Sequence, residues 1–183
     1  MKRPTDRIFT ISNALSLSRI FLTLPLVWAL ETDHMQAVIV MIVLAVLSDF
    51  FDGYLARRAH EITNVGKMLD PIADKFIMMA VMIFLIFDPE RRFPIYFFLL
   101  LALRDITNSN IATYLMNIRV EVYQSNPTGK WFLSVTALAM VLYILRFNEI
   151  GFWVLLLATV LLLVSWYFYL RRYVEYFKTL PES

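Results

Sequence analysis

Residues 36–56 read QAVIVMIVLAVLSDFFDGYLA, and residues 67–87 read KMLDPIADKFIMMAVMIFLIF. Both runs are mostly apolar and have the length of about 20 residues that a helix needs to cross the hydrocarbon core of a bilayer. Each run also contains two aspartates, and together these are Asp49, Asp52, Asp70 and Asp74. Because a carboxylate at membrane depth is costly unless it has a partner, intramembrane acids indicate a functional site.

The composition favours a membrane protein over a soluble one. The chain has 183 residues, of which 60% are hydrophobic and 17% are charged, whereas soluble domains average about 45–50% apolar and about 25% charged residues. Short polar connections separate six apolar segments, which cover residues 9–30, 36–56, 67–87, 93–117, 130–147 and 150–170. We therefore expect an all-α, polytopic membrane protein with six transmembrane helices, in a single domain over residues 1–183. The net charge of +2 is too small to indicate a nucleic-acid partner.

Lysine and arginine residues are distributed unevenly between the two ends of these segments. If the N-terminus is cytoplasmic, ten of them lie on the cytoplasmic side, namely Lys2, Arg3, Arg7, Arg57, Arg58, Arg119, Lys130, Arg171, Arg172 and Lys178. The opposite side then has three, which are Arg91, Arg92 and Arg146. Because cytoplasmic connections carry an excess of Lys and Arg, we expect both termini and the aspartate cluster to be cytoplasmic.

Helical geometry places the aspartates among small residues. At about 100° per residue, one arc of about 100° on the helix expected over residues 36–56 holds Asp49, Asp52, Gly53 and Ala56. An arc of about 80° on the next helix holds Gly66, Asp70 and Asp74. The short connection makes the two helices antiparallel neighbours, so both arcs can face one cavity. Pro71 either kinks the helix expected over residues 67–87 or marks its start.

Four carboxylates in one cavity repel one another strongly unless multivalent cations lie between them. A single aspartate at a helix end is more often a cap or a solvated residue, but four on facing arcs indicate a metal site. Oxygen ligands suit Mg²⁺ or Mn²⁺, whereas zinc prefers His or Cys, which are not part of this pattern.

Eight positions of the chain form a recognisable string, Asp49-x2-Asp52-Gly53-x2-Ala56-Arg57-x8-Gly66-x3-Asp70-x3-Asp74. This string matches every fixed position of the signature of the CDP-alcohol phosphatidyltransferase family, which the chain therefore resembles. The length, the six apolar segments and the opening residues Asn13 to Arg19 are similar to those of the family's smaller bacterial members. The context Leu69 to Lys75 is similar to that of its phosphatidylglycerophosphate synthases and single-motif cardiolipin synthases.

The resemblance implies the family's fold and its reaction, in which a hydroxyl-bearing acceptor takes the phosphatidyl group of CDP-diacylglycerol and CMP is released. It also implies phospholipid biosynthesis in a bacterial inner membrane, and a homodimer. Four carboxylates and a pyrophosphate diester sum to about −6, which two divalent cations and Arg57 bring to about −1. Two such ions can polarise the phosphoryl oxygens and stabilise the leaving CMP.

The resemblance also implies roles for individual residues. The metal ligands would be Asp49, Asp52, Asp70 and Asp74, and Asp74 would also be the general base that takes the acceptor's proton. The CDP-diacylglycerol site would comprise Asp52, Gly53, Ala56, Arg57 and Gly66. Arg57 would hold the pyrophosphate, and the three small residues would form the close-fitting cytidine surface.

The acceptor is less clearly indicated than the reaction. Candidate acceptor-binding residues are the cations that would face the same cavity, namely Arg19, Arg104, Arg119 and Lys130. Such cations suit glycerol 3-phosphate, which we expect as the acceptor, or an inositol phosphate. Phosphatidylglycerol is the alternative, because Arg104-Asp105 stands where phosphatidylglycerophosphate synthases usually have Arg-Glu, and Gly129-Lys130 lacks the second Lys and the Thr usual after it. Asp105 could also pair with Arg104 as a purely structural partner.

Two functions of other classes stay open on the sequence. The acids could coordinate the permeating cation of a transporter or channel, although they cluster at one membrane face rather than along a path. A catalytically idle scaffold could also keep all eight signature residues. Trp166, Tyr167, Tyr169, Tyr173 and Tyr176, at a basic helix end, resemble an interfacial aromatic belt, where Arg171 and Arg172 would meet anionic membrane lipids.

Overall fold

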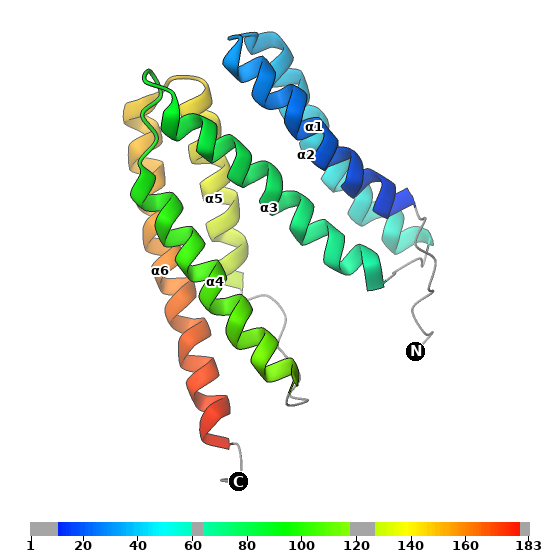
Figure 1. Cartoon of the computed structure of the whole chain (residues 1–183), viewed down its shortest axis with the longest axis vertical. Helices are drawn as coiled ribbons and strands as arrows, with labels where there is room; N and C mark the ends of the chain where they lie inside the picture. The colour runs from blue at the N-terminus through cyan, green and yellow to red at the C-terminus, as the bar shows by residue number, and fades with distance from the viewer. Residues whose placement is uncertain (1–10, 60–63, 118–126, 180–183) are drawn as a thin grey trace. The chain divides into compact units, whose positions relative to one another are not determined.

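The computed structural model describes residues 11–59, 64–117 and 127–179 of the chain. Every regular element in these ranges is a helix (Figure 1), and the helices are α1 (Ile11–Glu31), α2 (Met35–Ala59), α3 (Asn64–Phe87), α4 (Ile95–Asn117), α5 (Pro127–Ile144) and α6 (Asn148–Thr179). Their ends lie within three residues of those of the six expected segments, except that α6 continues to Thr179, beyond the expected end at residue 170. The all-α fold class is confirmed.

One of these helices is clearly suited to crossing a membrane. Within the described ranges, Asn148–Glu175 of α6 is long and apolar enough to do so by length and composition. Shorter apolar stretches occur at Met35–Ser48 and Gly129–Ile144. Large apolar side chains are also exposed on several helices, among them Phe21 and Leu24, each 70% exposed. Such exposure is uncommon over wide areas of soluble proteins and is typical of surfaces that meet lipid or a partner.

The chain divides into two compact units, Met1–Phe84 and Leu85–Ser183. In the first unit, α1 and α2 pack together as a helical hairpin around Leu26, Ala29, Leu30 and Val38, whose side chains are buried. Asp33 adopts a left-handed conformation with φ of 56°, and the His34 N–H donates to the Ala29 carbonyl at 2.9 Å. This capping geometry ends α1 and reverses the chain into α2. The single domain over 1–183 stays a prediction.

In the second unit, α5 and α6 form a corresponding hairpin. Arg146 takes the left-handed conformation with φ of 64°, and the Phe147 N–H donates to the Leu142 carbonyl at 2.9 Å. Buried side chains from both helices line the contact, among them Ala139, Leu155, Ala158 and Leu162. The ring of Phe93, before α4, packs on Tyr143 with centroids 5.0 Å apart.

The connection from α3 to α4 is hydrogen-bonded to the end of the α5–α6 hairpin. Arg91, 1% exposed, pairs with Asp88, and its Nε donates to the Ile144 carbonyl at 3.4 Å. Asn148 donates from Nδ2 to the Glu90 carbonyl at 2.7 Å. Arg91, one of the three basic residues expected on the non-cytoplasmic side, is therefore a buried ion-pair member rather than an exposed charge.

Candidate active site

The signature positions lie on two continuous helices. α2 continues to Ala59 and so contains Asp49, Asp52, Gly53, Ala56 and Arg57, while α3 contains Gly66, Asp70 and Asp74. The helical spacing assumed from the sequence is therefore confirmed for both halves of the string. Pro71 lies inside α3, which begins at Asn64, so it does not mark the start of the helix.

Asp74 is the one signature residue whose side chain falls within the described part of the chain. The side chains of the other seven lie outside it, so the predicted metal and CDP-diacylglycerol ligands stay predictions. Among the described residues, no group of three or more His, Cys, Asp or Glu side chains is close enough to hold a metal ion.

Asp74 forms an ion pair with Arg19, which the sequence had suggested as an acceptor ligand. The Arg19 Nη1 donates to Asp74 Oδ1 at 2.6 Å, which joins α1 to α3 across 55 residues of sequence. The Arg19 side chain is 2% exposed and that of Asp74 is 55% exposed. Thr23, also buried, donates from Oγ1 to the Arg19 carbonyl at 3.1 Å. The structure thus connects α1 directly to the aspartate string.

A second cluster of polar side chains surrounds Arg104, where α4, α5 and α6 supply the neighbours. The Arg104 Nη1 donates to Asp105 Oδ1 at 3.0 Å, with the two side chains 11% and 14% exposed. Its Nη2 lies 3.5 Å from the Ser165 Oγ, and its guanidinium carbon lies 5.0 Å from the Phe132 ring centre and 5.9 Å from that of Tyr169. The predicted structural pair with Asp105 is therefore present.

Arg104 has hydrogen-bonding capacity beyond that pair. A guanidinium carries five N–H donors in a planar fork. The buried Arg104 Nε and the buried Oδ1 of Asn108, one helical turn away, have no hydrogen-bond partner among the described residues. A buried polar atom without a partner is costly and requires an explanation, such as a water or a ligand. The structural pair and a ligand-binding role are thus compatible.

Of the two remaining acceptor candidates, the structure describes Lys130 but not Arg119. Lys130 is exposed in the first turns of α5. Its neighbour Gly129 is close to the Arg104 cluster, because a Cβ on Gly129 would lie 3.7 Å from the Ser165 Oγ and 4.0 Å from the Arg104 Nη2. Arg119 lies outside the described residues.

The sequence did not lead us to Ser165 or Asn108, and it led us to treat the tyrosines near the end of α6 as one interfacial belt. Tyr173 is 7% exposed and Tyr167 is 62% exposed, so the aromatic end of α6 has an outward and an inward face. Tyr169 packs against Tyr173, with centroids 6.2 Å apart, as well as against Arg104. Ser165 had one signal, as a small polar residue within the apolar run VLLLVSWYF.

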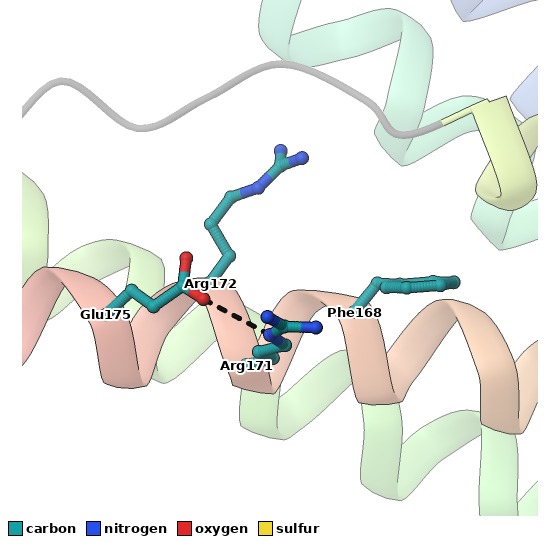
Figure 2. A pocket seen from close by; sticks show the side chains of 4 residues that line it. All are labelled: Phe168, Arg171, Arg172 and Glu175. Carbon is teal, nitrogen blue, oxygen red and sulfur yellow. Dashed lines mark hydrogen bonds and ion pairs between the residues drawn. The ribbon is translucent and has the colours of Figure 1, made fainter.

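The basic end of α6 borders a hollow of about 310 Å³ that is lined by Phe168, Arg171, Arg172 and Glu175. Figure 2 shows Arg171 turned toward Glu175, whose Oε1 lies 3.2 Å from the Arg171 Nε, while Arg172 extends away from both. The ion pair is exposed, with side chains 63% and 64% accessible, so it contributes little to stability.

Comparison with known proteins extends over most of the chain. A family model described as CDP-alcohol phosphatidyltransferase matches residues 9–167. A protein of Rickettsia bellii named CDP-diacylglycerol–glycerol-3-phosphate 3-phosphatidyltransferase is 33% identical over 145 residues, which are 75% of this chain and 78% of that protein. A protein of Bacillus subtilis with the same name is 29% identical over 165 residues, or 79% and 83% of the two chains.

A protein of Aquifex aeolicus, also with this name, is 43% identical over 99 residues, or 53% of this chain and about half (54%) of that protein. The region matched by the family model contains all eight signature positions together with Arg19, Arg104 and Lys130. The match confirms the resemblance inferred from the signature: the chain belongs to the CDP-alcohol phosphatidyltransferase family.

Proposed function

We propose that this protein transfers the phosphatidyl group of CDP-diacylglycerol to the hydroxyl of glycerol 3-phosphate, yielding phosphatidylglycerophosphate and CMP in phospholipid biosynthesis. The observation that carries the proposal is the complete eight-residue signature in a chain that the family model matches over residues 9–167. The three relatives compared above, all named for transfer to glycerol 3-phosphate, support this choice of acceptor.

The proposed metal site consists of Asp49, Asp52, Asp70 and Asp74, which would hold two Mg²⁺ or Mn²⁺ ions. This all-oxygen donor set has the chemistry that these cations prefer. When bound, the ions would polarise the phosphoryl oxygens and stabilise the charge on the departing CMP. The half-exposed carboxylate of Asp74 suits its two proposed roles, because it is accessible to a ligand and to an acceptor hydroxyl.

The CDP-diacylglycerol site would be formed by the same two helices. Arg57 would bind the pyrophosphate through charge-assisted hydrogen bonds, while Gly53, Ala56 and Gly66 would admit the cytidine close to the backbone. Asp52 would contribute to the donor site as well as to the metal site. Asp74 would accept the proton of the acceptor hydroxyl as the new ester bond forms.

For the acceptor, the Arg104 cluster is the best-supported binding site among the described residues. Its Nε and the nearby Asn108 Oδ1, which have no hydrogen-bond partner within the described ranges, would meet the phosphate and a hydroxyl of glycerol 3-phosphate, respectively. Lys130 would add a second cation from the start of α5. Arg119 is retained as a predicted contributor.

A second acceptor, phosphatidylglycerol, is favoured by one specific observation. The chain has Asp105 after Arg104, and Trp131-Phe132-Leu133 after Lys130, which resembles cardiolipin synthases more than phosphatidylglycerophosphate synthases. The structure adds that Phe132 packs under the Arg104 guanidinium. A cationic site next to an aromatic ring would suit either a small phosphate or a lipid phosphodiester.

The proposed setting is the bacterial inner membrane, with six spans and with both termini and the site in the cytoplasm. Support comes from the six apolar segments and the excess of basic residues on one side. The protein is further proposed to be a homodimer in contact with membrane lipids, with no nucleic-acid partner. Family membership favours catalysis over the transporter and the idle scaffold, neither of which would release CMP.

An acceptor panel tests the proposal. Purified protein is given CDP-diacylglycerol, Mg²⁺ and one acceptor at a time, and lipid products are separated by chromatography. The acceptors are glycerol 3-phosphate, phosphatidylglycerol, an inositol phosphate, inositol and serine. Phosphatidylglycerophosphate as the main product supports the proposal. Product with phosphatidylglycerol alone would make the protein a cardiolipin synthase.

A further inference from the structure

Arg19 is a charged side chain that is almost completely buried in an apolar helix. It is 2% exposed, within the run SLSRIFLTLPL of α1. Removing a guanidinium from water is costly, and the cost is offset only by an opposite charge in good geometry. Asp74 provides that charge, with its Oδ1 2.6 Å from the Arg19 Nη1. The position of Arg19 is thus tied to a carboxylate of the proposed active site.

The two side chains of the pair differ in exposure, which suits a pair in which Arg19 supports a ligand-binding carboxylate of Asp74. Arg19 approaches the carboxylate from the protein interior, while the Asp74 side chain is 55% exposed. A carboxylate has two oxygens and about four lone-pair positions, so a hydrogen bond at Oδ1 is compatible with cation binding by the same group. Groups that hydrogen-bond to metal-ligating side chains fix their orientation and strongly affect metal affinity.

Exposure gives an independent reason for this arrangement. The Arg19 side chain is 2% exposed, whereas the side chain of Arg104, the residue proposed to bind the acceptor phosphate, is 11% exposed. Arg104 is therefore the more accessible of the two to an acceptor, while Arg19 is placed to support the Asp74 carboxylate.

We propose that Arg19 is a positioning residue for the metal site, which orients the Asp74 carboxylate, rather than a ligand of the acceptor. The inference rests on the proposed role of Asp74 as a metal ligand and adds a residue outside the eight-residue signature. It also gives α1 a defined part in catalysis, because the ion pair fixes α1 against α3 at the position of Asp74.

The test measures Mn²⁺ affinity by electron paramagnetic resonance of the free ion, without acceptor, in wild type and in Arg19→Gln, Arg19→Lys, Asp74→Asn and the Arg19→Gln/Asp74→Asn double variant. We expect Arg19→Gln to weaken Mn²⁺ binding by about 10- to 100-fold and Arg19→Lys to restore most of it. In the Asp74→Asn background, Arg19→Gln should have no further effect, because Arg19 acts through Asp74. The double variant buries no unpaired charge, so it remains informative if Asp74→Asn, which removes the carboxylate that pairs with the buried Arg19, folds poorly.

Arg91→Gln is the matched control, because Arg91 is equally buried and pairs with Asp88 in the connection after α3. It should lower stability and leave Mn²⁺ affinity unchanged. Two results would overturn the inference: unchanged Mn²⁺ affinity in Arg19→Gln, or an equal loss with and without the Asp74 carboxylate. An increased acceptor KM with normal Mn²⁺ affinity would return Arg19 to the acceptor site.

Acceptor turnover separates this inference from the proposed function. Wild-type protein that binds Mn²⁺ in the expected way but releases no CMP would contradict the proposed function and leave the role of Arg19 supported. Wild-type protein that is active, with an Arg19→Gln variant of unchanged Mn²⁺ affinity, would contradict the inference alone. A wild-type protein that binds no Mn²⁺ would overturn both.

Discussion

At the scale of single residues, Asp74 combines two proposed roles and one observed contact. Asp74→Asn keeps the size of the side chain and removes the charge that would accept the acceptor's proton. We expect turnover to fall by at least about 10²-fold, the usual scale for lost general-base assistance, while CDP-diacylglycerol still binds. Steady-state kinetics and a separate measurement of CDP-diacylglycerol binding check this.

Asp33→Asn is a suitable control for Asp74→Asn, because Asp33 lies in the connection between α1 and α2 and outside the proposed site. It should retain wild-type turnover. Thermal unfolding of both variants in detergent shows whether loss of the Arg19 partner has harmed folding. Near-normal turnover in a well-folded Asp74→Asn variant would assign the base to another residue.

Arg104 and Lys130 are the described residues proposed to bind the acceptor phosphate. A hydrogen bond to a charged group contributes about 1.5–3 kcal/mol, so Arg104→Ala or Lys130→Ala should raise the KM for glycerol 3-phosphate about tenfold or more. The KM for CDP-diacylglycerol should change much less, because the proposed donor site lies on α2 and α3. Kinetics with each substrate varied in turn measure both constants.

Arg171→Ala serves as the matched control for these substitutions, since Arg171 is an exposed arginine paired with Glu175. Both KM values should stay near those of the wild type. If Arg104→Ala and Lys130→Ala leave the acceptor KM unchanged as well, the acceptor site is elsewhere. Arg119 would then be the next residue to test.

At the scale of elements, the connection between α3 and α4 is stabilised by one aspartate. Burial raises the pKa of Asp88, but the N–H groups of Arg91 and Glu90 and the Arg91 guanidinium outweigh this and hold the pKa below its usual range. A carboxylate whose pKa is lowered by folding stabilises the folded state above its unfolded pKa of about 3.9. That contribution is lost as the pH falls through the lower, folded-state pKa.

Replacing Asp88 tests this stabilisation directly. Asp88→Asn leaves the buried Arg91 without its carboxylate and should lower the free energy of unfolding by about 3 kcal/mol. It should also remove part of the decrease in the free energy of unfolding that occurs as the pH falls from about 4 to the folded-state pKa of Asp88. Unfolding in detergent as a function of pH measures both effects.

Glu90→Gln provides the comparison for Asp88→Asn, because the Glu90–Arg146 pair at 2.9 Å is largely exposed, at 64% and 44%. Its effect should stay below about 1 kcal/mol. Equal effects of the two substitutions, or an unchanged pH profile in Asp88→Asn, would show that the connection is not held by this carboxylate.

The helices were predictable from the sequence, whereas the contacts between side chains on different helices were not. Long apolar runs bounded by polar connections located all six helices, and the spacing of the aspartates on α2 and α3 followed from helical geometry. The Arg19–Asp74 pair joins residues 55 positions apart, and no local pattern encodes such a contact. The same holds for Ser165 beside Arg104, 61 positions away. The extension of α6 to Thr179 was missed because its last turns are polar and aromatic rather than apolar.

At the scale of the whole molecule, the eight-residue signature and the family match support one reaction, whereas the choice of acceptor is proposed to depend on a few residues around Arg104. Those residues differ from the usual pattern at Asp105 and after Lys130. Single charged contacts can change which acceptor binds while the metal-dependent chemistry on the donor is kept. The reaction class was therefore predictable from the sequence, whereas the acceptor requires measurement.

Metal-dependent phosphatidyl transfer is tested most directly by measuring release of CMP from CDP-diacylglycerol by the purified protein with glycerol 3-phosphate. We expect CMP release with Mg²⁺ or Mn²⁺, none in excess EDTA, and recovery when the metal is restored, because four clustered aspartates and a pyrophosphate need cations between them. Undiminished CMP release in excess EDTA, or no release with either metal and any acceptor of the panel, would contradict the account.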